Sequence, residues 1–162
     1  MQIYTAYFKS PLGPIEIVAS PDGILALHFV EEMLAGDGEL PFCQKECLKQ
    51  LDEYFKGERR DFFLNLQPAG TEFQKSVWRH LEKIPYGGTT SYGAIADVLG
   101  KPNASRAVGS ANGKNPIAII IPCHRVIGSD GRLTGYGGGM WRKRWLIGFE
   151  KGELEPPSDI SA

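Results

Sequence analysis

Residues 117–126 read Ile-Ala-Ile-Ile-Ile-Pro-Cys-His-Arg-Val, an apolar run followed by a proline and three side chains with chemical function. A short continuous apolar run of this kind predicts a buried strand over 117–121. Pro122 lacks the amide hydrogen that a strand ladder needs, so the strand is expected to end there. Cys123 should then lie at the rim of a rigid element.

The residues after Cys123 favour a nucleophilic role for its thiol. His124 and Arg125 follow directly, and neighbouring positive charge lowers the pKa of a thiol and raises its thiolate fraction. We therefore predict an activated thiolate. Because adjacent side chains of an extended segment point apart, His124 needs a bend or a bridging water to act on Cys123.

Glu150 is the candidate for orienting the imidazole of His124. It ends a predicted last helix whose Trp141, Trp145 and Phe149 share one face, which could dock the helix toward the strand. A carboxylate in this role holds the ring and stabilises its charged form. The alternatives are ordinary: an inert core cysteine, a histidine that is merely hydrogen-bonded and a solvated terminal glutamate.

A glycine-rich loop, Gly-Tyr-Gly-Gly-Gly at 135–139, lies between this segment and the last helix. A backbone without side chains can approach a planar ligand and donate amides to it. A phosphate-binding loop is the rival interpretation, but the Gly-Lys-Ser/Thr ending of a P-loop is absent. A pocket for a base fits the pattern better.

Upstream, the pattern predicts three helices with short breaks. Thr71 and Gln74 form a capping-box pattern, and the first helix then buries Phe73, Val77, Leu81 and Ile84. Thr90 and Ser91 offer a hydroxyl cap to a second helix carrying Ile95, Val98 and Leu99, and the third spans 104–112. Two short helices joined by a tight turn are a helix-turn-helix candidate.

The third helix is thin, because most of its residues are small and Arg106 is its one long side chain. Recognition helices in the major groove usually project several polar side chains at base edges, and this one has few to project. A thin helix can approach another surface closely. Tight burial against neighbouring elements is the alternative.

The first half of the chain predicts a three-stranded antiparallel meander and a helix. The strands are expected at 3–8, 13–19 and 24–29, separated by Pro-Gly turns, with a possible fourth at 62–66. The helix carries Cys47, Leu48, Leu51, Tyr54 and Phe55 at helical spacing. We predict an α/β lobe over 1–70, a second lobe over 71–152 and a flexible acidic tail over 153–162.

Composition narrows the class of protein. With 162 residues, 42% hydrophobic, the chain can form a compact core, and no apolar stretch or leader pattern predicts a membrane span or a signal peptide. An intracellular protein is expected. Three cysteines do not suggest a disulfide framework, and Cys43 and Cys47 lack the partners of a zinc site, so Cys47 is interpreted as core and Cys43 as half-buried.

Charge is distributed unevenly although the net charge is only −1. Residues 1–70 carry six basic and eleven acidic side chains, whereas residues 71–152 carry twelve and five. This asymmetry suits one lobe that meets a polyanion and another that does not. Ordinary solvated charge would give the same totals, so charge alone leaves both interpretations open.

The run Pro-Cys-His-Arg-Val at 122–126 resembles the O6-alkylguanine-DNA alkyltransferase family, also called methylated-DNA–protein-cysteine methyltransferases. The resemblance covers the second half in order and spacing, through Phe73-Gln74 with Val77-Trp78, Thr90-Ser91-Tyr92, Ser105–Gly109, Lys114-Asn115-Pro116 and Gly135–Gly138. The first lobe matches only in its strand and helix pattern. Ala118 and Asn112 depart from some members, which have proline and methionine there.

The resemblance implies a fold and a set of roles. The fold would be α/β (α+β), with a small ribonuclease-H-like N-terminal lobe packed on a mainly helical, winged-helix-like C-terminal lobe. Cys123 would attack the alkyl carbon, His124 would accept the proton through a water, Glu150 would orient His124, and Asn115 would brace the nearby turn. The remaining implied positions are the substrate contacts Tyr92, Cys123, Val126, Tyr136, Gly137 and Gly138, and the DNA contacts Arg106, which would enter the vacated stack, Ala107, Gly109, Ser110, Thr90, Ser91 and Asn112.

The implied activity is DNA repair by direct reversal. One alkyl group would pass irreversibly from O6-alkylguanine, or O4-alkylthymine, in double-stranded DNA to Cys123 after the base is flipped from the minor-groove side. The resemblance implies no cofactor and no metal, a monomer, and a place in the cytoplasm, or in the nucleus of a eukaryote. The rivals are a cysteine hydrolase and a lesion-binding module that does not react.

Overall fold

The computed structural model describes residues 1–154, which form two compact units, 1–68 and 69–154. The acidic tail predicted at 153–162 lies outside the described residues from position 155 onward. Among residues 1–154, each helix is too short or too polar to pass through a bilayer.

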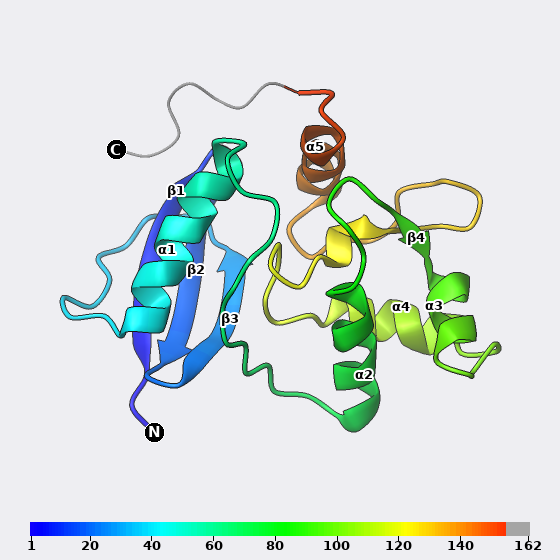
Figure 1. Ribbon diagram of the computed structural model, residues 1–162, viewed down its shortest axis with the longest axis horizontal. Coiled ribbons are helices and arrows are strands. Elements are labelled where there is room, and N and C mark those ends of the chain that lie inside the picture. Colours follow the sequence, from blue (N-terminus) through cyan, green and yellow to red (C-terminus); the bar gives the residue numbers. More distant parts are fainter. Residues whose placement is uncertain (155–162) are drawn as a thin grey trace. The chain divides into compact units, whose positions relative to one another are not determined.

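The first unit is an antiparallel sheet with one helix, as predicted. Strands β1 (Tyr4–Ser10), β2 (Gly13–Ser20) and β3 (Gly23–Phe29) pair in the order β1-β2-β3. Helix α1 (Phe42–Phe55) lies across one face of the sheet (Figure 1). The core between them contains Ile15, Ile17, Leu27, Leu51 and Phe55, all fully buried.

The strand predicted at 62–66 is wrong. Only Leu66 pairs, through an isolated parallel bridge to Ile24, and the rest of the segment is extended without a ladder. Gln50 of α1 supplies the missing bonds, because its side chain accepts from the Phe63 amide at 2.9 Å and donates to the Phe63 carbonyl at 3.2 Å. A side chain thus replaces a strand neighbour here.

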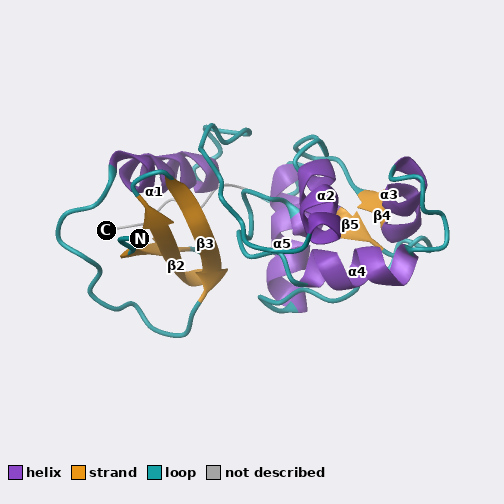
Figure 2. Cartoon of the chain, turned by 90° about the horizontal axis from the view of Figure 1, so that it is seen from below, coloured by secondary structure: helices purple, strands orange, loops and turns teal. Residues whose placement is uncertain are grey.

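The second unit consists mainly of helices: α2 (Glu72–Leu81), α3 (Tyr92–Val98), α4 (Ser105–Gly113) and α5 (Met140–Glu150). The helix caps are confirmed. Thr71 and Gln74 form the complete capping box, and the Ser91 hydroxyl accepts from the Ala94 amide at 3.1 Å. Figure 2 shows the small parallel pair of strands β4 (Thr90–Ser91) and β5 (Val126–Ile127) among these helices.

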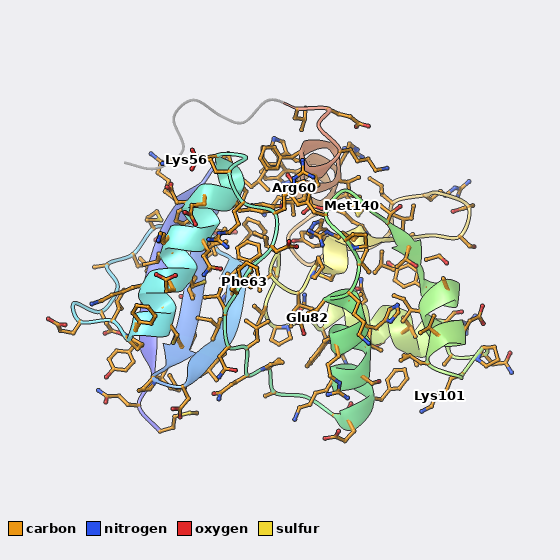
Figure 3. All side chains as sticks on the ribbon, viewed as in Figure 1. Lys56, Arg60, Phe63, Glu82, Lys101 and Met140 are labelled. Carbon is orange, nitrogen blue, oxygen red and sulfur yellow. The ribbon has the colours of Figure 1, made fainter. Side chains whose placement is uncertain are left out.

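Helices α3 and α4 form the predicted helix-turn-helix and pack against each other and against α2. The Trp78 indole of α2 donates to the Ala111 carbonyl of α4 at 2.8 Å. Lys101, labelled in Figure 3, lies in the α3–α4 turn with its Nζ 5.1 Å from the Phe73 ring centroid. Val98 of α3 is 66% exposed, whereas Ile95 is fully buried.

The strand predicted at 117–121 is also wrong, although its burial is confirmed. The segment is a series of turns, in which the Ile121 amide donates to the Ile117 carbonyl at 3.1 Å. Ile119 has a φ of 70°, the only positive φ outside glycine in residues 1–154. The left-handed region is costly for a β-branched residue, so tertiary contacts must hold this conformation.

Candidate active site

The nucleophile candidate lies in a single 3-10 turn, Cys123–Arg125, followed by strand β5 (Val126–Ile127). The turn is the bend that a Cys-His pair requires, because it replaces the alternation of an extended chain. Val126 pairs in parallel with Thr90 of β4 (Thr90–Ser91), which fixes the turn beside the start of α3. Cys123 is 6% exposed and His124 is fully buried.

The predicted contact between His124 and Glu150 is present. His124 Nε2 lies 2.8 Å from Glu150 Oε2, and both side chains are buried. His124 Nδ1 has no hydrogen-bond partner among the described residues. One ring nitrogen is thus engaged by the carboxylate and the other is left for a second partner.

Arg125, whose charge was predicted to act on the thiol, is paired with Glu150 instead. Its Nε and Nη2 donate to the two oxygens of Glu150 at 2.8 and 3.0 Å, and Nη1 donates to the Ile84 carbonyl at 2.7 Å. The guanidinium therefore orients the carboxylate that orients the histidine. Burial alone would raise the pKa of Glu150, but the charge and hydrogen bond of His124, and then those of Arg125, hold this pKa well below its usual range.

The Cys123 thiol has a raised pKa, contrary to the lowering predicted from the neighbouring positive charge. Burial raises its pKa, against the hydrogen bond from the Asn115 side chain, the charge of Lys143 and its own backbone amide, which lower it. Desolvation penalises the charged form more than these groups favour it. Burial therefore favours the neutral thiol, and His124 follows Cys123 directly in the chain.

Sequence reasoning did not identify Lys143. Its side chain is buried, its Nζ donates to the Thr134 carbonyl at 2.6 Å, and its charge acts on Cys123. Burial lowers the pKa of Lys143, against the effect of Cys123. The signal was available, because Lys143, Leu146 and Glu150 recur at spacings of three and four along the helix.

That spacing also corrects the predicted face of α5. Trp141 is 53% exposed, and the buried face consists of Lys143, Leu146, Phe149 and Glu150. Trp145 and Phe149 do stack, with ring centroids 4.7 Å apart.

Gly87, with a φ of 82°, approaches the end of α5 so closely that a Cβ there would lie 3.2 Å from the Glu150 carbonyl oxygen.

Two asparagines connect α4 to the nucleophile segment. Asn115 donates to the Ile121 carbonyl at 2.7 Å and accepts from the Ile117 amide at 3.0 Å, which holds the strained turn. Asn112, expected to contact DNA, is instead 3% exposed and donates to the Cys123 carbonyl at 3.3 Å. Asn112 therefore belongs to the packed inner face of α4 and is not available to contact DNA.

The other face of α4 is open. Arg106, Ala107 and Ser110 are exposed, and Gly109 lies against the Tyr92 ring, where a Cβ would meet ring atoms at 3.7 and 3.8 Å. The Tyr92 hydroxyl lies 2.7 Å from Thr134 Oγ1, in the segment that leads to the glycine loop. Thr90 is half-buried, and Ser91 is used as the α3 cap.

The glycine loop is held at the start of α5. The Gly139 amide donates to the Tyr136 carbonyl at 2.9 Å, and Arg142 Nη1 donates to the Gly138 carbonyl at 2.6 Å. Gly137 is exposed with open space at its Cβ position. The Tyr136 hydroxyl is buried and has no hydrogen-bond partner among residues 1–154.

The fold and the site together define a helix-turn-helix protein with a buried thiol centre, and comparison with known proteins gives the family. Residues 3–68 match the ribonuclease-like domain and residues 72–152 the DNA binding domain of 6-O-methylguanine DNA methyltransferase. The chain belongs to this family, which confirms the predicted resemblance.

Individual relatives agree over nearly the whole chain. A methylated-DNA–protein-cysteine methyltransferase of Methanosarcina acetivorans is 48% identical over 153 residues, which cover 91% of this chain and 98% of that protein. The solved O6-methylguanine methyltransferase of Mycobacterium tuberculosis is 44% identical with a TM-score of 0.84, covering 98% of this chain and 97% of that one. A structure of the M. tuberculosis protein OGT in complex with DNA is 46% identical with a TM-score of 0.83, covering 92% and 93%.

Proposed function

We propose that this protein repairs DNA by moving the alkyl group of O6-alkylguanine, or of O4-alkylthymine, to its own Cys123. The observation that carries the proposal is the buried array in which Glu150 binds His124, the residue that follows the buried Cys123 in the same 3-10 turn. The relatives named as methylated-DNA–protein-cysteine methyltransferases support the same chemistry. The second unit, 69–154, would contact DNA and carry out the transfer, and the first would support it.

The reaction is a direct displacement. The thiol proton passes through a water to His124 Nδ1, while Glu150 stabilises the imidazolium that forms. A bond forms between Cys123 Sγ and the alkyl carbon as the bond from that carbon to O6 breaks, and the electron pair remains on guanine. The proton then neutralises the released base. A thioether is a poor leaving group, so each molecule reacts once.

The base must leave the duplex to reach a thiol that is 6% exposed. Flipping costs a few kcal/mol, and a side chain that fills the gap offsets part of that cost. The exposed Arg106 of α4 would enter the stack from the minor groove, with Ala107, Gly109 and Ser110 against the backbone and Thr90 and Ser91 nearby. Tyr92, Val126, Tyr136, Gly137 and Gly138 would surround the flipped base. We place this monomeric protein in the cytoplasm, or in the nucleus of a eukaryote.

Intact-protein mass spectrometry tests the proposal. Incubation with a duplex that contains O6-methylguanine should add one methyl group per molecule, on Cys123, and restore guanine. Cys123→Ala should gain none, whereas a lesion-binding module would be indifferent to this change. An unmodified wild-type protein after prolonged incubation would rule the proposal out.

A further inference from the structure

The active site contains a buried hydroxyl for which the mechanism above has no use. The Tyr136 Oη is buried without a partner among residues 1–154, as is His124 Nδ1. An unpaired buried polar group costs about 1–3 kcal/mol, and a phenylalanine would avoid that cost. In the proposed mechanism His124 Nδ1 accepts the thiol proton, whereas the Tyr136 hydroxyl has no role.

Hydrogen bonds on both sides of Tyr136 join its segment to α5, the helix whose Glu150 binds His124: Lys143 donates to the Thr134 carbonyl and Arg142 to the Gly138 carbonyl. The charged or ionisable groups that act on the Tyr136 hydroxyl are Cys123, Arg142 and Glu150. Burial first, and then Cys123, raises the pKa of Tyr136 well above its usual value, so the phenol keeps its proton. It is a neutral donor that cannot become a second anion beside the sulfur.

The loop that carries Tyr136 is held in place independently of the hydroxyl. The Gly139 amide bonds to the Tyr136 carbonyl, and Arg142 bonds to the Gly138 carbonyl, at 2.9 and 2.6 Å. The Arg142 guanidinium lies 4.6 Å from the Trp141 ring centroid. A donor fixed before the substrate arrives needs no reorganisation during the reaction.

We propose that Tyr136 is a catalytic residue whose hydroxyl donates a hydrogen bond to the leaving O6 atom of the flipped guanine. This inference rests on the proposed function and goes beyond a packing role for the ring. As the carbon moves from O6 to Sγ, negative charge develops on O6, and the hydrogen bond strengthens without transfer of the phenolic proton. The proton that finally neutralises guanine is the one held on His124.

The test compares two leaving atoms in one duplex sequence, O6-methylguanine and S6-methyl-6-thioguanine. Tyr136→Phe should slow methyl transfer from oxygen by roughly 100-fold, as for other donors to a developing oxyanion. Transfer from sulfur should hardly change, because sulfur is a weak hydrogen-bond acceptor. The rate ratio of the two substrates is therefore the readout, and a general loss of structure would not alter it.

Tyr92→Phe is the matched control, since it also removes one phenolic hydroxyl, here the one bonded to Thr134. In this variant the ratio of the transfer rate from oxygen to the transfer rate from sulfur should equal that of the wild type, even if both rates change. The thermal midpoint of Tyr136→Phe should equal or exceed that of the wild type. A fluorotyrosine at 136, which keeps the hydroxyl, should restore transfer from oxygen.

Equal slowing of both substrates by Tyr136→Phe, or no slowing of the oxygen substrate, would overturn the inference while leaving the proposed function intact. A wild-type protein that gains no methyl group from either duplex would instead overturn the proposed function itself. The two failures are distinguished by measuring the wild type first.

Discussion

At the scale of single residues, Glu150 organises the site. Its two oxygens accept from His124 and twice from Arg125, and its side chain is 2% exposed. A carboxylate buried with these partners is costly to disturb, because removing it leaves positive charge without compensation. The same residue therefore stabilises the fold and, in the proposed reaction, also supports the chemistry.

Glu150→Gln should lower the free energy of unfolding by about 3–5 kcal/mol at pH 7, the usual cost of breaking a buried pair. The pKa of Glu150 is lower in the folded state than in the unfolded chain, where it is about 4.3. The ionised carboxylate therefore stabilises the folded state fully above the unfolded-state pKa, and this stabilisation is lost as the pH falls toward the folded-state pKa. Urea unfolding from pH 7 down to pH 3 should show the wild type losing this advantage.

The exposed Glu153→Gln is the control, and it should change stability by less than about 0.5 kcal/mol throughout. A difference between Glu150→Gln and wild type that stays constant, or grows, as the pH falls would contradict the assignment.

At the scale of elements, α4 has two functions on two faces. Its inner face is held by Trp78 and by the bonds of Asn112 and Asn115 to the nucleophile segment. Its outer face presents Arg106, the one long side chain among small ones. These two faces explain why α4 is built of small residues. Large side chains on the inner face would separate the helix from the nucleophile segment, and large side chains on the outer face would keep it from approaching DNA in the proposed function.

Arg106→Ala should slow repair of O6-methylguanine in duplex DNA much more than reaction with free O6-benzylguanine. The free base needs no flipping, so filling the vacated stack matters only for the duplex. Single-turnover rates with both substrates measure the difference. Parallel slowing of the two reactions would reject the role of Arg106 in the stack.

Local signals in the sequence predicted most elements, and tertiary effects account for the errors. The caps at Thr71 and Ser91 and the turns between strands are local, and they are confirmed. The apolar run 117–121 indicates burial but not conformation, because the amide of Asn115 supplies bonds that a strand ladder would otherwise provide. The thiol pKa was mispredicted because burial of Cys123 raises it, while the Arg125 guanidinium bonds to Glu150 and Ile84 instead of to the thiol.

At the scale of the whole molecule, charge separates along the chain, with eleven acidic and six basic residues in 1–70 against five and twelve in 71–152. Binding to phosphates releases counterions and weakens as salt rises. Affinity for duplex DNA should therefore fall at least about tenfold between 50 and 200 mM salt, as expected for two or more phosphate contacts.

A matched pair of lysines tests which unit carries these contacts. Lys114→Gln, exposed just after α4, should reduce the slope of log affinity against log salt, whereas Lys9→Gln, exposed on β1, should leave it unchanged. Fluorescence anisotropy titrations give both slopes. The reverse pattern would assign DNA contact to the first unit.

The burial of Cys123 also governs how long an unused molecule survives. Because Cys123 is 6% exposed and its pKa is raised by burial, we expect its thiol to react slowly with peroxides and small electrophiles, which attack accessible thiolates. Selectivity then comes from delivery of the damaged base rather than from the intrinsic reactivity of the sulfur. An unreacted molecule can therefore persist until a damaged base enters its active site, and it then reacts once.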